Sequence, residues 1–223
     1  MIPQNPARLI DHTLLKPDAT ADQVCRLCEE AVEYGFASVC IPPVFVPLAA
    51  DLLYGSDVAV GTVVGFPLGY LPTSVKVFET IEAVARGATE IDMVIHLGAA
   101  LTDRTDDVED EIRQVVRAAG GAVVKVILEC CYLDDSRKQV LAGCVVNAGA
   151  AYVKTSTGFG SGGATLADVA LLARTVAGRI GVKAAGGIRD WHACREFLAT
   201  GATRVGTSAG MTIVDQWRRE QGL

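Results

Sequence analysis

The sequence predicts an α/β protein folded as one (β/α)8 barrel, the TIM-barrel class, over residues 1–223. Short runs of β-branched residues alternate with segments of helical periodicity along the whole chain, which is typical of repeated βα units. Eight such pairs fit into 223 residues, as in a compact barrel. A Gly-Ala pair recurs where a helix is expected to end, at residues 87–88, 149–150 and 201–202, and glycine there supplies a left-handed helix C-cap. We therefore expect a single domain without a linker, with an open doubly wound sheet as the alternative.

The individual elements follow from the two periodicities, and the first strand has the weakest pattern. The expected strands are residues 8–12, 37–41, 58–64, 90–94, 123–128, 151–154, 181–183 and 203–206. The expected helices are residues 20–34, 44–54, 73–86, 106–119, 134–148, 165–177, 190–199 and 209–220. Three of these helices begin with typical capping residues, which are Thr73-Ser74, Asp134-Asp135 and Thr165.

Composition and charge limit the classes of function. Half of the residues are hydrophobic, and a chain of this length can bury a large core. No apolar run reaches the ~18–20 residues that cross a bilayer, and the first residues lack the pattern of a secretory signal. A net charge of −6 argues against a nucleic-acid surface. We expect a cytoplasmic protein without nucleic-acid or membrane partners, in which local groups bind any anionic substrate.

Cysteines and histidines indicate neither a disulfide framework nor a metal site. Seven scattered cysteines suit a reducing compartment. Cys25 and Cys28 have the spacing of a redox or zinc motif, but they lie inside an expected helix without a second pair. We interpret them as packing residues, and the adjacent Cys130 and Cys131 likewise. The three histidines are isolated from one another, at His12, His96 and His192.

Two lysines stand at the ends of two successive expected strands. Lys154 closes Ala-Tyr-Val-Lys, Lys183 closes Ile-Gly-Val-Lys, and glycine-rich sequence follows each. Burying an ammonium group is costly, so two of them directed from a core to one place indicate a function. We expect the two cations to depress each other's pKa, which leaves one of them as a neutral amine nucleophile. This is the chemistry of a Schiff-base lysine.

Other polar residues fall at strand ends or inside strands, and barrel enzymes place their active sites at the strand ends. Asp92 lies between apolar neighbours, and with Lys154 and Lys183 it forms a set of one acid and two bases. For Lys125 and Glu129, on and after the fifth strand, we favour a structural ion-pair role. The remaining strand-end residues are Asp11, His12, Thr13 and Cys40, of which His12 is interpreted as a packing residue.

Glycine-rich segments follow the last three expected strands. Residues 184–189 and 206–210 stand after the seventh and eighth strands, where barrels commonly bind phosphate, and Gly158 and Gly160 follow the sixth. Glycine lets backbone N–H groups approach an anion, and a helix N-terminus adds partial positive charge. Each loop alone could be a tight turn, but their coincidence predicts a phosphate site.

Eight segments carry a resemblance to a known family. They are Ile-Asp-His-Thr-Leu-Leu-Lys-Pro (10–17), Ser-Val-Cys-Ile-Pro-Pro (38–43), Val-Val-Gly-Phe-Pro-Leu-Gly (63–69), Glu-Ile-Asp-Met-Val-Ile (90–95), Val-Lys-Val-Ile-Leu-Glu (124–129), Val-Lys-Thr-Ser-Thr-Gly-Phe-Gly (153–160), Val-Lys-Ala-Ala-Gly-Gly-Ile-Arg (182–189) and Arg-Val-Gly-Thr-Ser (204–208). In this order they resemble the deoxyribose-phosphate aldolase family over about residues 8–215.

The resemblance implies a class I aldolase that interconverts 2-deoxy-D-ribose 5-phosphate with D-glyceraldehyde 3-phosphate and acetaldehyde, without a metal or organic cofactor. It implies that Lys154 is the Schiff-base lysine, Asp92 the proton donor and acceptor, and Lys183 the second lysine of the proton relay. It also implies a set of substrate-binding residues, which are Asp11, Thr13, Cys40, Gly158, Gly186, Gly187, Gly206, Thr207 and Ser208. A homodimer is a further expectation from the family.

The chain departs from the family pattern at a few positions, and two other functions compete. Ala209 stands where many relatives have a second serine, His96 where many have asparagine, and the C-terminal Gln-Gly-Leu lacks the tyrosine of some mobile tails. A transaldolase-like Schiff-base barrel is one alternative, which substrate profiling with ketose donors would reveal. A catalytically silent sugar-phosphate sensor is the other, although such a protein has no need of a neutral amine.

Overall fold

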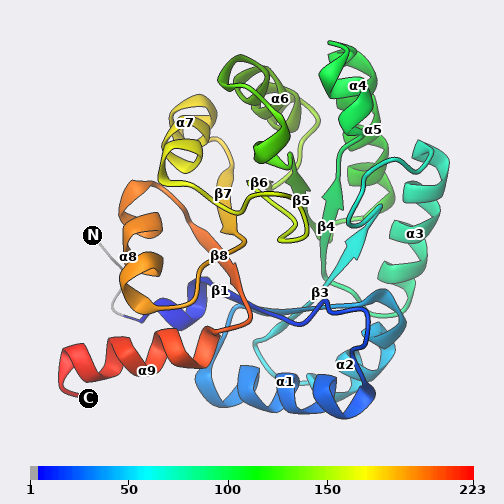
Figure 1. The fold of residues 1–223 in the computed structure, drawn as a ribbon. Coiled ribbons are helices and arrows are strands. Elements are labelled where there is room, and N and C mark those ends of the chain that lie inside the picture. The colour runs from blue at the N-terminus through cyan, green and yellow to red at the C-terminus, as the bar shows by residue number, and fades with distance from the viewer. Residues whose placement is uncertain (1–4) are drawn as a thin grey trace.

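The computed structural model describes residues 5–223, which form a closed barrel of eight parallel strands (Figure 1). The strands are β1 (Ile10–Thr13), β2 (Ser38–Ile41), β3 (Ala59–Val64), β4 (Glu90–Val94), β5 (Val123–Ile127), β6 (Tyr152–Lys154), β7 (Gly181–Ala185) and β8 (Arg204–Thr207). They pair in chain order, and β1 pairs with β8 to close the ring. The predicted (β/α)8 barrel is confirmed, and the doubly wound alternative is wrong.

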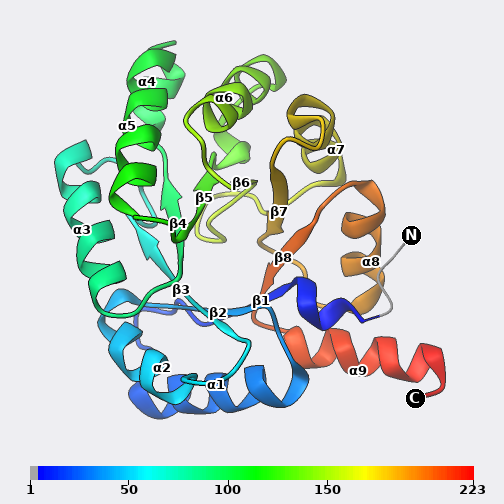
Figure 2. The ribbon, with the colours of Figure 1, turned by 180° about the vertical axis from the view of Figure 1, so that it is seen from behind.

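Helices surround the barrel when it is seen from either side (Figures 1 and 2). They are α1 (Ala21–Tyr34), α2 (Val46–Leu52), α3 (Thr73–Ala85), α4 (Leu97–Leu101), α5 (Thr105–Ala118), α6 (Asp135–Asn147), α7 (Leu166–Val176), α8 (Trp191–Thr200) and α9 (Gly210–Gln221). Short 3-10 turns precede or follow strands at η1 (Pro6–Leu9), η2 (Pro43–Phe45) and η3 (Cys130–Tyr132). No helix within residues 5–223 is long and apolar enough to cross a membrane.

The first strand begins later than expected, at Ile10 instead of residue 8. Pro6 occupies the first turn of η1, and the side chain of Asn5 accepts a hydrogen bond from the backbone N–H of Ala7 at 3.0 Å. Proline fixes a φ angle that suits a helical turn and has no N–H to donate to a sheet ladder. Residues 6–9 therefore form a capped 3-10 turn that leads into β1.

The capping predictions are confirmed for two helices and wrong for one. Asp134 and Thr165 cap α6 and α7, since their side chains accept N–H groups three residues later. At α3 the N-cap position is taken by Pro72, which has no side-chain hydrogen-bonding group, so Thr73 becomes the first helical residue. The short helix α4 was not expected from the sequence, and it is capped by the side chain of His96.

The glycine of each Gly-Ala pair adopts the left-handed conformation predicted for helix C-termini. The φ angles are +108° at Gly87, +83° at Gly149 and +119° at Gly201. A Cβ atom on Gly87 would lie 2.6 Å from the Cβ of Ala50, and one on Gly201 would lie 2.7 Å from that of Ala173. Glycine at these two positions therefore permits the backbone turn and also the close packing of neighbouring helices.

Alternation along each strand determines which residues reach the barrel interior. Successive strand residues point to opposite faces, so Ile91 and Met93 of β4 pack in the core between barrel and helices. Glu90 and Asp92 on the same strand contact Lys125 of β5, inside the ring. The interior thus contains charged side chains where most barrels have apolar layers.

Candidate active site

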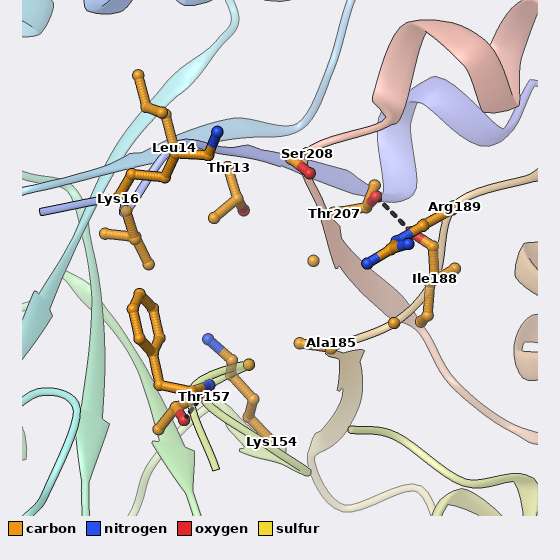
Figure 3. A pocket seen from close by; sticks show the side chains of 16 residues that line it. Thr13, Leu14, Lys16, Lys154, Thr157, Ala185, Ile188, Arg189, Thr207 and Ser208 are labelled. Carbon is orange, nitrogen blue, oxygen red and sulfur yellow. Dashed lines mark hydrogen bonds between the residues drawn. The ribbon is translucent and has the colours of Figure 1, made fainter. Parts of the chain in front are cut away.

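Lys154 is the last residue of β6, and its amino group points into a cavity of about 230 Å³ (Figure 3). Only 3% of its side chain is exposed. Its Nζ lies 2.7 Å from Oδ2 of Asp92. The strand end therefore places one amine between the open cavity and a buried carboxylate.

Asp92 lies beneath Lys154 and binds three lysines. Its Oδ2 accepts hydrogen bonds from Lys154 and, at 2.6 Å, from Lys183, while its Oδ1 accepts one from Lys125 at 3.0 Å. Burial would raise the pKa of Asp92, but Lys125, Lys154 and Lys183 together hold it well below its usual value. Asp92 is therefore a carboxylate anion at neutral pH.

The pKa values of Lys154 and Lys183 shift in opposite directions. Burial lowers the pKa of Lys154, Asp92 opposes this shift, and the positive charge of Lys183 lowers the pKa further. Burial also disfavours the charged form of Lys183, but Asp11 and Asp92 outweigh it and raise its pKa above the ordinary value. The expected mutual depression is therefore wrong for Lys183. Lys183 contacts two carboxylates and Lys154 only one, so Lys154 loses its proton more easily than Lys183 does.

Asp11 lies deeper in the barrel than the cavity, although the resemblance implies that it contacts the substrate. Its carboxylate accepts hydrogen bonds from Lys183, from Lys125 at 3.0 Å and from Arg204 at 2.7 Å, and it does not line the cavity. These three cations hold the pKa of Asp11 far below its usual value, although burial acts in the opposite direction. Lys125 makes buried ion pairs, as expected, and its partners include Glu90 and Asp92.

The other strand-end residues differ in their access to the cavity. Thr13 lines it, and its hydroxyl donates to the backbone carbonyl of Asp11 at 2.9 Å. Cys40 is 1% exposed and lies outside the lining, and burial raises the pKa of its thiol to about 11. Glu129 makes no bond to Lys125; its carboxylate instead accepts the hydroxyl and, at 3.1 Å, the N–H of Thr157. Glu129 therefore holds the loop that follows Lys154.

The glycine-rich loops after β6, β7 and β8 meet along the cavity. The predicted residues that line it there are Gly158, Gly186, Gly187, Gly206, Thr207 and Ser208. Gly187 has a φ of +85° and no atom within 4 Å of a Cβ position, so its backbone is open. A Cβ on Gly206 would lie 3.0 Å from Cε of Lys183, so glycine there also makes room for that lysine.

Thr207 connects two of these loops through its hydroxyl. The hydroxyl donates to the carbonyl of Ile188 at 2.6 Å, as Figure 3 shows, and accepts the N–H of Ala209 at 2.9 Å. Helix α9 begins directly afterwards at Gly210, and no side chain within residues 5–223 caps its N-terminus. The first N–H groups of α9 therefore have no side-chain partner in the described part of the chain.

The cavity is positively charged although the chain has a net charge of −6. Among the described residues, the cations Lys16 and Arg189 line it beside Lys154, and no carboxylate does. Eight further residues line the cavity without a role predicted for each individually, although three of them lie in the glycine-rich segment 184–189; they are Leu14, Leu15, Lys16, Thr157, Phe159, Ala185, Ile188 and Arg189. Lys16 and Arg189 stand within a few residues of the carboxyl ends of β1 and β7. This position in the sequence is the feature that could have identified them as candidate site residues.

The cysteines and histidines lie outside this site or pack beside it. No group of His, Cys, Asp and Glu side chains within residues 5–223 is suited to a metal ion. Cys28 is buried on α1, and burial is the main reason that its pKa rises to about 11. His12 is buried and contacts Glu30 at 2.7 Å, and Nδ1 of His96 accepts the N–H of Ala99 at 2.9 Å.

Comparison with known proteins places this chain in a family. A sequence model of the DeoC/LacD family of aldolases matches residues 7–214. A deoxyribose-phosphate aldolase from Syntrophotalea carbinolica is 57% identical over 220 residues, covering 99% of this chain and all of the relative. One from a Geobacillus species is 54% identical over 95% of each chain. The tetrameric structure of deoxyribose phosphate aldolase from Aeropyrum pernix superimposes with a TM-score of 0.89 at 37% identity, covering 95% of this chain and 90% of that one. The chain belongs to the DeoC/LacD family of aldolases.

Proposed function

We propose that this protein is a class I deoxyribose-phosphate aldolase. It reversibly cleaves 2-deoxy-D-ribose 5-phosphate to D-glyceraldehyde 3-phosphate and acetaldehyde through a Schiff base on Lys154. The observation that carries the proposal is the buried amine of Lys154, which reaches a cationic cavity while it shares the Oδ2 atom of Asp92 with Lys183.

The phosphate of the substrate binds at the glycine-rich side of the cavity. The open backbone at Gly187 and the uncapped start of α9 supply N–H groups, and Ser208 supplies a hydroxyl. Arg189 and Lys16 add positive charge at the same cavity. This arrangement leaves the aldehyde end of the open-chain sugar to face Lys154.

Imine formation begins when the neutral amine of Lys154 attacks the C1 aldehyde. Water leaves, and the resulting protonated imine accepts the electron pair of the C2–C3 bond as that bond breaks. Asp92 takes the proton of the C3 hydroxyl through a water molecule and returns it in synthesis. Lys183 stays an ammonium group and holds Asp92 in place. Cleavage leaves an enamine on Lys154, which takes up a proton at C2 to become the imine of acetaldehyde, and hydrolysis of this imine restores the amine.

Borohydride reduction in the presence of acetaldehyde tests this assignment. A reduced ethyl adduct should appear on the peptide that contains Lys154, and Lys154→Leu should abolish both the adduct and cleavage. Lys16→Met is the matched control, because Lys16 also lines the cavity but does not contact Asp92. That variant should still trap adduct on Lys154. An undiminished adduct on another lysine in Lys154→Leu would contradict the proposal.

The proposal extends to a cytoplasmic homo-oligomer, with a dimer as its smallest form. All seven cysteines are free, in agreement with a reducing compartment. Large apolar side chains are exposed around α3 and the loops beside it, including Val44, Tyr70, Phe78 and Ile81. Light scattering with size-exclusion chromatography tests the assembly, and Phe78→Asp should dissociate it if this surface is the interface.

A further inference from the structure

The ion pairs around Asp92 continue away from the cavity, deeper into the barrel. Lys125 contacts Asp92 and Asp11, each at 3.0 Å. Lys183 likewise contacts both Asp92 and Asp11. Lys154 is attached to this network by its single contact with Asp92.

Glu90 and Arg204 form the far end of the network, at the starts of β4 and β8. Oε2 of Glu90 lies 2.5 Å from Nζ of Lys125, and Nη1 of Arg204 lies 2.7 Å from Oδ1 of Asp11. Arg204 also approaches Glu90, with Nη2 at 3.5 Å from Oε1. Neither residue lines the cavity, and both are largely buried. The strand starts are thus connected to Lys154 by an unbroken series of charged groups.

The charges of this network balance only when Lys154 is neutral. Apart from Lys154, its cations are Lys125, Lys183 and Arg204. Its anions are Asp11, Glu90 and Asp92. A proton on Lys154 would add one unbalanced positive charge to a buried interior, which is costly. The neutral amine is therefore the state that the rest of the network favours.

We propose that Glu90 and Arg204 are positioning residues that set the pH range in which Lys154 reacts, through the charge balance of the barrel interior. This rests on the proposed function, because it requires Lys154 to form the imine. Without the negative charge of Glu90 the interior is more positive, so Lys154 loses its proton at lower pH. Without the positive charge of Arg204 the shift is reversed. Asp11 then still has Lys125 and Lys183 as partners and stays ionised.

The other groups that face this network leave the balance unchanged. Cys40 faces it from β2, and burial keeps its thiol protonated at neutral pH with a pKa of about 11. Tyr152 of β6 lies beside Arg204, with its ring centroid 5.5 Å from the guanidinium carbon. Lys16 and Arg189 line the cavity but are exposed, where water and salt screen their charges.

Two single variants and their combination test the proposal through the sign of a pH shift. The rate at which borohydride traps the acetaldehyde adduct on Lys154 is measured as a function of pH and divided by its maximum value. In Glu90→Gln the midpoint should move down by about one pH unit, and in Arg204→Gln it should move up by a similar amount. This is the size expected for a unit charge roughly 10 Å away at an effective dielectric constant of about 20. The double variant should return the midpoint close to the wild-type value.

Controls separate this role from packing and from the proposed function. Arg204→Lys keeps the charge but loses the guanidinium geometry, so its midpoint should stay near wild type. Each trapping rate is divided by the folded fraction measured at the same pH, so a loss of stability alone cannot imitate the opposite shifts. Shifts in the same direction, or no shift in either single variant, would overturn the proposal. Absence of an adduct on Lys154 in the wild-type protein would instead reject the proposed function.

Discussion

Replacing Lys183 with leucine should move imine formation by Lys154 to higher pH. Nζ of Lys154 and Nζ of Lys183 contact the same Oδ2 atom of Asp92 at 2.7 and 2.6 Å, so the two nitrogen atoms are at most about 5 Å apart. At an effective dielectric constant of about 20, two unit charges at about 5 Å repel by about 3 kcal/mol, or roughly two pKa units. The variant also leaves Asp92 with one cation fewer, which favours the ammonium form of Lys154. We expect adduct trapping at pH 7 to fall roughly a hundredfold and to recover as the pH rises.

The assay is the pH profile of borohydride-trapped acetaldehyde adduct in folded protein. Loss of one partner from a buried ion pair costs about 3–5 kcal/mol of stability, so urea denaturation should accompany each profile. Lys76→Leu is the matched control, because Lys76 is also fully buried and pairs with Glu111 at 2.7 Å outside the cavity. That variant should lose stability while the midpoint of its profile stays at the wild-type pH. A wild-type trapping rate at pH 7 in Lys183→Leu would refute the account of Lys183 as a cationic neighbour.

Four other perturbations have distinct expected outcomes. Asp92→Asn removes the anion that raises the pKa of Lys154, so adduct trapping at pH 7 should persist, while cleavage of deoxyribose 5-phosphate should fail at every pH tested. Gly187→Asp should weaken cleavage of deoxyribose 5-phosphate more than cleavage of deoxyribose. Gly187→Ala is its control, because it introduces the same backbone strain without the charge. Ser208→Ala should be milder and cost less than about 3 kcal/mol of transition-state binding. The folded-state pKa values of Asp11 and Asp92 are depressed, so their contribution to stability is complete above the unfolded value of about 3.9 and declines as the pH falls below it. Urea midpoints measured between pH 7 and pH 2.5 should fall along the acid part of this range, and a flat profile would contradict the depressed pKa values.

The order and type of the barrel elements could be predicted because each βα unit repeats the same local signals. β-Branched runs, helical periodicity and left-handed glycines are properties of short segments, and they identified the eight strands with ends mostly within one or two residues. Helix α4 spans only Leu97–Leu101, too short to show a period, and its cap is a histidine side chain. The cap at α3 was misassigned because Pro72 takes the capping position immediately before Thr73.

The site was less predictable, because height inside a barrel depends on the stagger between strands. Alternation identifies Asp11 and Cys40 as inward-facing, but it does not say how far below the cavity each lies. Lys183 pairs in register with Lys154 on β6 and with Arg204 on β8, and this relation appears only when the strands are aligned. In the sequence Glu90 is only a polar residue at the start of a strand. Its contact with Lys125 likewise appears only when the strands are aligned.

Structural and catalytic roles cannot be assigned to separate residues in this interior. Lys125 fills space inside the barrel and pairs with Glu90. Its positive charge also offsets part of the attraction between Asp92 and a protonated Lys154. In the proposed mechanism a substitution at Asp92 changes proton transfer, the pKa of Lys154 and the pairing of Lys125 at once, so its rate loss is not the contribution of a single contact. Double-mutant cycles between Asp92 and Lys125 separate these effects when the coupling is measured once by adduct trapping and once by cleavage. Coupling that is large for cleavage but small for trapping would place Lys125 in the proton transfer, whereas equal coupling would restrict it to the charge balance that keeps Lys154 neutral.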